Sequence, residues 1–172
     1  MPELLLVRHA EPERKGVLLG RLDPALSEAG HRVAAQCMPG LCGAIAYVSP
    51  LRRAQQTASY LPAEIERVTV PDLAELDLGD WEGLLWEDVE LQWPDLARRK
   101  LERWFDVPAP GGEGWKEISA RARRVLEILK SGPRPAIVVA HLGINSVLRH
   151  CLTGCDPQSH SQQYCEVLEL AL

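Results

Sequence analysis

The sequence predicts an α/β fold, a three-layer sandwich in which helices cover both faces of a mostly parallel central sheet. Short apolar runs alternate along the chain with stretches of helical length and pattern. This alternation is typical of parallel strands joined by helical crossovers. Two of the runs, residues 4–7 and 136–140, are apolar throughout and rich in branched side chains, which is typical of strands buried on both faces.

The individual elements follow from local signals. Ser27 and Ser49 are residues that favour the N-cap of a helix, and Pro50 suits a first helical position. The predicted strands are residues 3–8, 45–48, 68–70, 136–140 and 167–172. The predicted helices are residues 27–38, 49–61, 114–131 and 143–153. Residues 79–112, with four of the five tryptophans, are expected to be irregular or short-helical.

Length and charge limit the classes of function. The 172 residues suffice for one domain with a substantial core, and residues 79–113 are expected to form a lid-like insertion in it. The net charge of −5 argues against a nucleic-acid partner. No apolar run approaches the length of a membrane span, and a strand begins almost at the first residue, so we expect no signal peptide, no membrane partner and a cytoplasmic location. Nothing indicates an oligomeric state.

Five cysteines are present, and this odd number favours free thiols. Cys151, Cys155 and Cys165, with His150 and His160 nearby, suggest a metal cluster as an alternative. Their spacing does not match a common zinc pattern, and cysteine is often simply buried. We therefore expect no metal site.

Two histidines each follow an apolar run. His9 ends the first run and His141 ends the one at 136–140. Ligands of open α/β sheets bind at the carboxyl ends of the strands, so the two rings are expected to share one site. Arg8, beside the first ring, indicates an anionic ligand. A neutral imidazole can attack phosphorus and form a covalent phosphoenzyme, with its other nitrogen held by a hydrogen bond.

Two further segments supply charged groups. Arg52 and Arg53 lie at the start of a predicted helix, where the helix N-terminus and a guanidinium group both favour phosphate. They point in different directions, so one is expected in the site and the other in solvent. Phosphate ester cleavage also needs a carboxyl group that protonates the leaving oxygen. Five acidic residues lie between 72 and 82, and their chemistry alone does not select one of them.

These segments together resemble the histidine phosphatase superfamily, also called the phosphoglycerate mutase-like family. The matches occur in the family's order and cover nearly the whole chain. They lie at residues 6–11, 49–54, 75–83, 110–113 and 139–143.

The resemblance implies a role for each site residue. His9 is the nucleophile that becomes phosphohistidine, and Glu75 is the general acid and base. Arg8, Arg53 and His141 hold the phosphoryl oxygens, where preorganised donors stabilise the transition state most. No metal and no other cofactor is implied.

Departures from the family pattern bear on the substrate. Pro12 is a variant that resembles some α-ribazole phosphatases, and Leu142 replaces a usual glycine. For the substrate side of the site we select Arg14, Arg21 and Trp86.

The expected function is that of a metal-independent phosphomonoesterase acting on a small phosphorylated metabolite, such as α-ribazole phosphate. Phosphoglycerate mutase is the main alternative, although mutases of this family are longer and need a bisphosphate to recharge the histidine. A phosphohistidine-protein phosphatase and a phosphate sensor without turnover are the others. A panel of phosphate esters separates these four functions.

Overall fold

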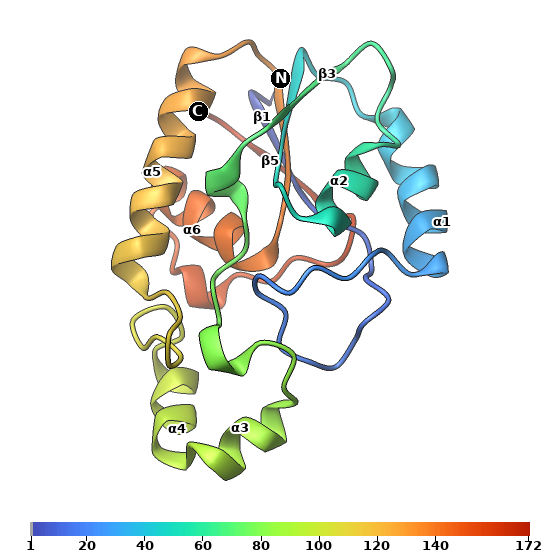
Figure 1. Cartoon of the computed structure of the whole chain (residues 1–172). Helices are drawn as coiled ribbons and strands as arrows, with labels where there is room; N and C mark the ends of the chain where they lie inside the picture. The colour runs from blue at the N-terminus through green and yellow to red at the C-terminus, as the bar shows by residue number, and fades with distance from the viewer. Residues whose placement is uncertain (1) are drawn as a thin grey trace.

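The computed structural model describes residues 2–172, and its centre is a five-stranded sheet (Figure 1). The strand order is β3-β2-β4-β1-β5. The first four strands run parallel to their neighbours, while β5 runs antiparallel along β1. The strands are β1 (Leu4–Arg8), β2 (Ile45–Val48), β3 (Glu66–Thr69), β4 (Ala136–Ala140) and β5 (Val167–Leu170).

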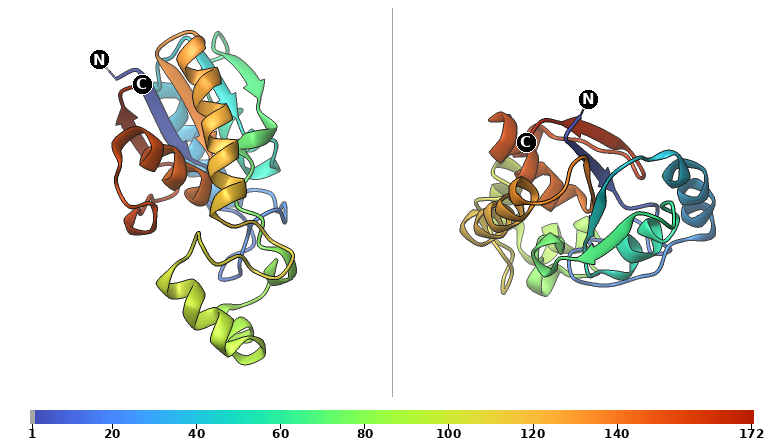
Figure 2. Two further views of the ribbon diagram at one scale, coloured as in Figure 1. Left: turned by 90° about the vertical axis from the view of Figure 1, so that its left-hand side faces the viewer. Right: turned by 90° about the horizontal axis from the view of Figure 1, so that it is seen from above.

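Helices cover both faces of this sheet. α1 and α2 lie against one face, and α5 and α6 lie against the other (Figures 1 and 2). The helices are α1 (Glu28–Cys37), α2 (Arg52–Ala58), α3 (Trp86–Gln92), α4 (Pro94–Glu102), α5 (Trp115–Ser131) and α6 (Leu142–Thr153). Short 3₁₀ turns lie at Met38–Gly40, Pro71–Leu73, Gly79–Trp81 and Pro157–Ser159.

The side chains of the central strands alternate between two cores. Leu4 and Leu6 of β1 belong to the core cluster that includes the buried faces of α5 and α6. Leu5 and Val7 belong to the cluster that includes α1 and α2. Because successive side chains of a strand point to opposite faces, one apolar run supplies both layers. The predicted three-layer α/β fold is confirmed.

One predicted helix start is wrong. Ser27 caps α1 as expected, since its side chain accepts a hydrogen bond from the Gly30 N–H. Ser49, however, does not cap α2, which begins at Arg52 with Leu51 at the N-cap. The Ser49 hydroxyl is hydrogen-bonded to a histidine ring instead, so tertiary contacts decide its role.

Residues 79–112 form two short helices and connecting turns, as predicted. α3 and α4 lie at the lower end of the view in Figure 1, away from the sheet. Trp81 is fully buried, and the rings of Trp86 and Trp93 pack 6.0 and 6.1 Å from it. These tryptophans join the insertion to the core that α5 and α6 share.

All five cysteines are free thiols, as expected, and of these Cys165 is buried. Within residues 2–172, no three His, Cys, Asp or Glu side chains group closely enough to hold a metal ion. In the same range, no helix is long and apolar enough to cross a membrane.

Candidate active site

Three polar side chains follow three neighbouring strands of the sheet. His9, Ser49 and His141 come directly after β1, β2 and β4, which lie side by side in the order β2-β4-β1. Because these strands are parallel, their carboxyl ends meet at one edge. The ring centroids of His9 and His141 are 5.0 Å apart, and both rings are buried. The structure therefore brings the two histidines together as the sequence predicted.

The His9 ring has a defined tautomer. Its Nδ1 lies 2.7 Å from the carbonyl oxygen of Ala10, and because a carbonyl only accepts, Nδ1 carries the proton. The Nε2 atom accepts a hydrogen bond from Nε of Arg53 at 3.3 Å. Burial, together with the charges of Arg53 and Arg8, lowers the pKa of His9 to about 3. The ring is thus neutral, and Nε2 is its unprotonated nitrogen.

Arg53 is the site member of the arginine pair. It lies in the first turn of α2 and is 1% exposed, whereas Arg52 is exposed to solvent. Its guanidinium group donates to the carbonyl oxygens of Leu22 at 2.7 Å and Gly20 at 2.9 Å. These bonds to the loop after β1 hold the group against His9. Helix position alone left the choice between the two arginines open, the family resemblance selected Arg53, and Arg53 is the buried one.

His141 is also neutral. Burial holds the pKa of His141 well below its usual value, and the positive charges of Arg53 and Arg8 act in the same direction. Its Nε2 lies 2.7 Å from Oγ of Ser49, and that hydroxyl also accepts a hydrogen bond from the Leu51 N–H. With the hydroxyl proton donated to Nε2, the ring proton lies on Nδ1. Within residues 2–172 this buried Nδ1 has no partner, so in the tautomer with the proton on Nδ1 it is a free donor.

Arg8 lies beside the two rings at the end of β1. Its guanidinium group donates to the carbonyl oxygen of Gln162 at 2.6 Å and stacks 4.2 Å from the ring centre of Tyr164. The Tyr164 ring itself lies 5.6 Å from the His9 ring. The Nε atom of Arg8 is buried without a partner inside the described range. Arg8 therefore also retains donor capacity for an anion.

The Glu75 carboxylate lies against the first turn of α6, the helix that begins directly after His141. One carboxylate oxygen accepts the N–H of Gly143 at 2.9 Å, and the other accepts the N–H groups of Ile144 at 3.1 Å and Leu76 at 2.7 Å. Two motifs nearly seventy residues apart are thereby joined by hydrogen bonds.

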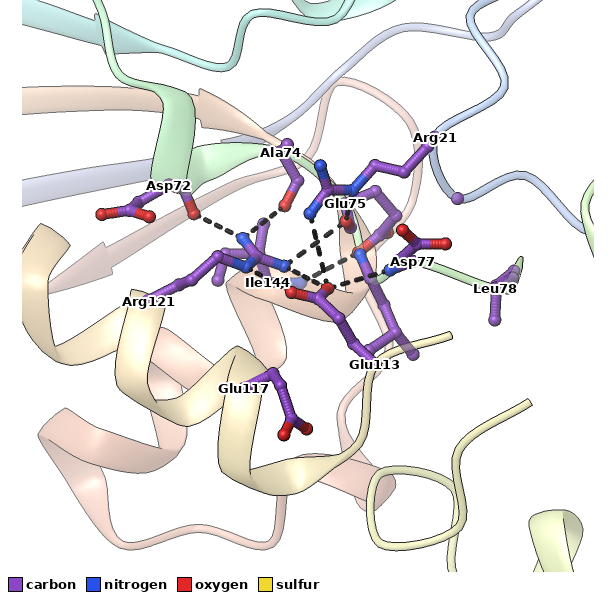
Figure 3. A network of polar contacts seen from close by, with 12 residues as sticks. Arg21, Asp72, Ala74, Glu75, Asp77, Leu78, Glu113, Glu117, Arg121 and Ile144 are labelled. Carbon is purple, nitrogen blue, oxygen red and sulfur yellow. Dashed lines mark hydrogen bonds and ion pairs between the residues drawn. The ribbon is translucent and has the colours of Figure 1, made fainter. Parts of the chain in front are cut away.

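A buried ion pair supports the backbone that carries Glu75 (Figure 3). Arg121 of α5 binds the Glu113 carboxylate with two hydrogen bonds of 2.8 and 2.7 Å. The same guanidinium group donates to the carbonyl oxygens of Asp72, Ala74 and Glu75 at 2.6, 2.9 and 3.4 Å. Arg121 thus binds three backbone carbonyl groups of the segment that leads to the site.

Glu113 is held in its ionised form by this pair. Burial raises its pKa, but hydrogen bonds from Arg121 and from the Asp77 N–H outweigh that effect, so the pKa of Glu113 is lowered. Arg21 completes the network, since its Nε donates to the carbonyl oxygen of Glu75 at 2.8 Å and its NH2 group lies 3.5 Å from Glu113. The carboxylate therefore has partners on three sides.

Glu82, another acidic residue of this region, has structural partners. Glu82 accepts hydrogen bonds from the N–H groups of Gly20, Arg21, Leu22 and Leu78. It therefore joins the loop after β1, which binds Arg53, to the segment after Glu75. Of the five acidic residues between 72 and 82, Glu75 is the one that lines the cavity described next.

A cavity of about 480 Å³ opens over His9. Its volume lies in the usual range of small-molecule sites. Most of its wall is apolar, with polar groups gathered near the strand ends. The lining residues are Arg8, His9, Pro12, Val17, Leu18, Leu19, Glu75, Leu76, Leu78, Leu101, Trp104, Phe105, Leu142, Gly143, Ser146, Pro157, Gln158, His160 and Tyr164.

The residues predicted for the substrate side lie outside this lining. Arg14 donates to the Gly83 carbonyl oxygen at 3.3 Å, and Arg21 is bound to the Glu75 backbone and to Glu113. Trp86 packs edge-on against Trp81, and its indole N–H donates to Glu90. Trp104 lines the cavity in its place. The prediction selected these residues because they lie close to the site motifs in the sequence. Packing and local hydrogen bonds instead direct their side chains away from the cavity.

Several supporting residues were not found from the sequence. Thr57 accepts the Ala10 N–H at 2.9 Å and donates to the Arg53 carbonyl oxygen, and its position one helical turn after Arg53 was an available signal. The sequence pattern indicated Ser49 only as a helix N-cap and as part of the motif at residues 49–54. Tyr164 lies in an irregular segment, and no local pattern marked it.

A match to a family model over nearly the whole chain shows the family to which the protein belongs. A family model described as the histidine phosphatase superfamily (branch 1) matches residues 4–171. The chain belongs to this superfamily. The matched range includes His9, Arg8 and Glu75, which line the cavity, and His141 and Arg53, which are buried beside His9.

Named relatives of this histidine phosphatase chain include mutases and phosphatases. A 2,3-bisphosphoglycerate-dependent phosphoglycerate mutase of Brucella suis is 38% identical over 130 residues, which are 69% of this chain and 63% of the mutase. The match thus spans less than two thirds of that relative. A mycobacterial glucosyl-3-phosphoglycerate phosphatase has a TM-score of 0.84 at 26% identity, covering 96% of this chain and 88% of the other. An α-ribazole phosphatase from Shigella flexneri shares the fold, with a TM-score of 0.81 at 22% identity and coverage of 99% and 96%.

Proposed function

We propose that this chain is a phosphomonoesterase that hydrolyses a small phosphorylated metabolite through a phosphohistidine intermediate. The observation that supports this most is the state of His9: a neutral ring with Nδ1 bound to the Ala10 carbonyl and an electron pair on Nε2. A nucleophile in this state needs no base to activate it. Free donors on Arg8 and His141 lie beside it.

In the first step, Nε2 of His9 attacks the phosphorus atom and the bond between phosphorus and the ester oxygen breaks. The Glu75 carboxyl group donates its proton to that leaving oxygen, so the alcohol departs neutral. Arg8, Arg53 and His141 donate hydrogen bonds to the three non-bridging oxygens. Because the protein already orients these donors, they need little reorganisation as charge develops.

In the second step, water attacks the phosphorus atom of phosphohistidine and the bond to Nε2 breaks. The Glu75 carboxylate takes a proton from the water, and inorganic phosphate leaves. His9 returns to its neutral form and Glu75 to its protonated form. The cycle therefore needs the ester, water and no other reactant.

Trapping of the phosphoenzyme tests this mechanism. The wild-type protein, mixed with a ³²P-labelled aryl phosphate and quenched in alkali, is expected to retain acid-labile label. His9→Asn is expected to lose both the label and essentially all turnover. His31→Asn, which changes a ring on α1 outside the cavity lining, serves as the control and is expected to keep both. Label that survives in His9→Asn contradicts the proposal.

Metal independence is part of the proposal and has its own test. Hydrolysis of p-nitrophenyl phosphate is expected to be unchanged after treatment with a chelator. Loss of activity that a divalent metal restores would overturn this part.

Phosphoglycerate mutase is the second candidate, because the Brucella relative is 38% identical over its matched part. The two functions differ in the acceptor of the phosphoryl group, which is water in one and a glycerate hydroxyl in the other. With 3-phosphoglycerate and catalytic 2,3-bisphosphoglycerate, we expect negligible isomerisation beside the release of phosphate from the best ester. Rapid bisphosphate-dependent formation of 2-phosphoglycerate would support the mutase instead.

A further inference from the structure

We infer that the alcohol part of the substrate is a bulky, uncharged and apolar group, such as a cycloalkyl or aryl alcohol, rather than a sugar or a glycerate. This inference rests on the proposed function, because it concerns the half of the cavity that lies beyond the phosphoryl group.

The cavity has two chemically distinct ends. The phosphoryl end carries Arg8 and His9 from the end of β1, and Glu75 from the segment after β3. The remaining wall carries apolar side chains from four separate segments, among them Leu18, Leu78, Leu101, Trp104, Phe105 and Leu142. An apolar wall contributed by so many segments favours an apolar leaving group, because burying it removes apolar surface from water on both sides.

The apolar end lacks a cation for an acidic leaving group. Arg8 is the single arginine or lysine in the cavity lining of the described chain, and it lies at the phosphoryl end. Arg14 and Arg21 are bound to the backbone at Gly83 and Glu75. A glycerate carboxylate or a second phosphate would therefore lose its hydration without gaining a paired charge.

The apolar end also offers few hydrogen bonds for sugar hydroxyls. Gln158 lines it, but its amide nitrogen donates to the Leu101 carbonyl oxygen at 2.9 Å and its amide oxygen accepts the Trp104 N–H at 2.9 Å. This residue ties the end of α4 to the Pro157–Ser159 turn. Ser146 also lines the cavity, and its hydroxyl donates to the Leu142 carbonyl oxygen. His160 and the Tyr164 hydroxyl are the polar groups left to bind a substrate.

Leu101 marks where the leaving group would lie. It is 53% exposed although it lines the cavity, so an apolar ligand would cover surface that now faces water. Leu91 on α3 is 83% exposed and does not line the cavity. The two leucines therefore form a matched pair for mutation.

A matched pair of substrates tests the inference. Cyclohexylmethyl phosphate and glucose 6-phosphate both release a primary alkoxide next to a six-membered ring, but the sugar ring carries hydroxyl groups. We expect kcat/KM to be at least about a hundredfold higher for cyclohexylmethyl phosphate, since each unpartnered buried hydroxyl costs roughly a factor of ten and burial of two of the sugar hydroxyls already gives that ratio. The sugar alkoxide is the better leaving group, so a preference in this direction reflects binding.

The leucine pair tests the location. Leu101→Gln is expected to reduce the preference by about tenfold, because it adds a hydrogen-bonding group to the apolar wall. Leu91→Gln is expected to leave the preference at the wild-type value. Thermal unfolding of both variants is measured alongside, so that a folding defect is recognised.

The outcomes separate the two proposals. Equal rates, or faster cleavage of glucose 6-phosphate, by a protein that still forms phosphohistidine would overturn the substrate class alone. Failure to cleave any ester or to label His9 would overturn the proposed function together with this inference. An equal change in Leu101→Gln and Leu91→Gln would overturn the assignment of the apolar wall.

Discussion

Gly143 and Glu75 are in direct contact across the active site: the Gly143 N–H donates to the carboxylate at 2.9 Å, and no room remains at the glycine α-carbon. A methyl group there would overlap Oε1 of Glu75. The glycine therefore lets the proposed acid lie directly on the first turn of α6.

Gly143→Ala is expected to displace the Glu75 carboxyl group without weakening the helix. Alanine favours a helix over glycine by about 1 kcal/mol, so the melting temperature should hardly change. Loss of a positioned acid lowers the rate by about a hundredfold or more, and we expect kcat for an alkyl phosphate to fall by that amount. Gly40→Ala, at a position with no neighbour within 4 Å, is the control. Unchanged kcat in Gly143→Ala would show that the contact is unimportant.

Glu75→Gln is expected to slow esters according to their leaving group. An alkoxide needs a proton as it departs, whereas p-nitrophenolate hardly needs one. Cleavage of an alkyl phosphate should therefore fall by about a hundredfold more than cleavage of p-nitrophenyl phosphate. Asp77→Asn, which changes a carboxylate bound to the Gly79 N–H, should slow both esters to the same small extent. Equal slowing of the two esters by Glu75→Gln would indicate a structural role only.

The low pKa of His9, about 3, predicts a contribution to stability that depends on pH. Below its usual pKa the unfolded ring binds a proton while the native ring stays neutral, so this contribution to the free energy of unfolding falls as the pH falls. For a usual pKa of about 6.5, the loss between about pH 7 and pH 5 is roughly 2 kcal/mol. Above about pH 7 both states are neutral and the contribution is constant.

Urea unfolding of wild type and His9→Gln at several pH values between about 5 and 7 measures this contribution, because the other titrating groups are the same in both proteins. The stability of the variant should fall less steeply toward low pH. Parallel curves would contradict the assignment of a neutral buried ring.

Arg121 and Arg124 provide a contrast between a buried and an exposed ion pair on one helix. Arg121 is 10% exposed in its side chain and pairs with Glu113, whereas Arg124 is 59% exposed and pairs with Asp72. Arg121→Gln should lower the free energy of unfolding by about 3–5 kcal/mol, because it leaves Glu113 charged and buried. Arg124→Gln should lower it by less than about 1 kcal/mol. Urea titration of both variants compares them, and equal losses would contradict the role given to Arg121.

Much of the fold was predictable from local pattern. The residues of β2 and β4 and the cap of α1 matched the expectation, since apolar runs and capping side chains act within a few neighbouring residues. Ser49 shows the limit of this reasoning: it has the properties of a cap, but its hydroxyl is hydrogen-bonded to His141, which lies ninety-two residues away. No local pattern encodes such a contact.

The sequence by itself determined the order of the strands along the chain, the two histidines at strand ends and the family motifs. Only the tertiary structure decided that Ser49 binds the His141 ring, that Glu75 binds the start of α6, and that the leaving-group half of the cavity is apolar. The physical reason is that these features depend on contacts between segments far apart in the chain. Such contacts form when the parallel strands align their carboxyl ends at one edge of the sheet.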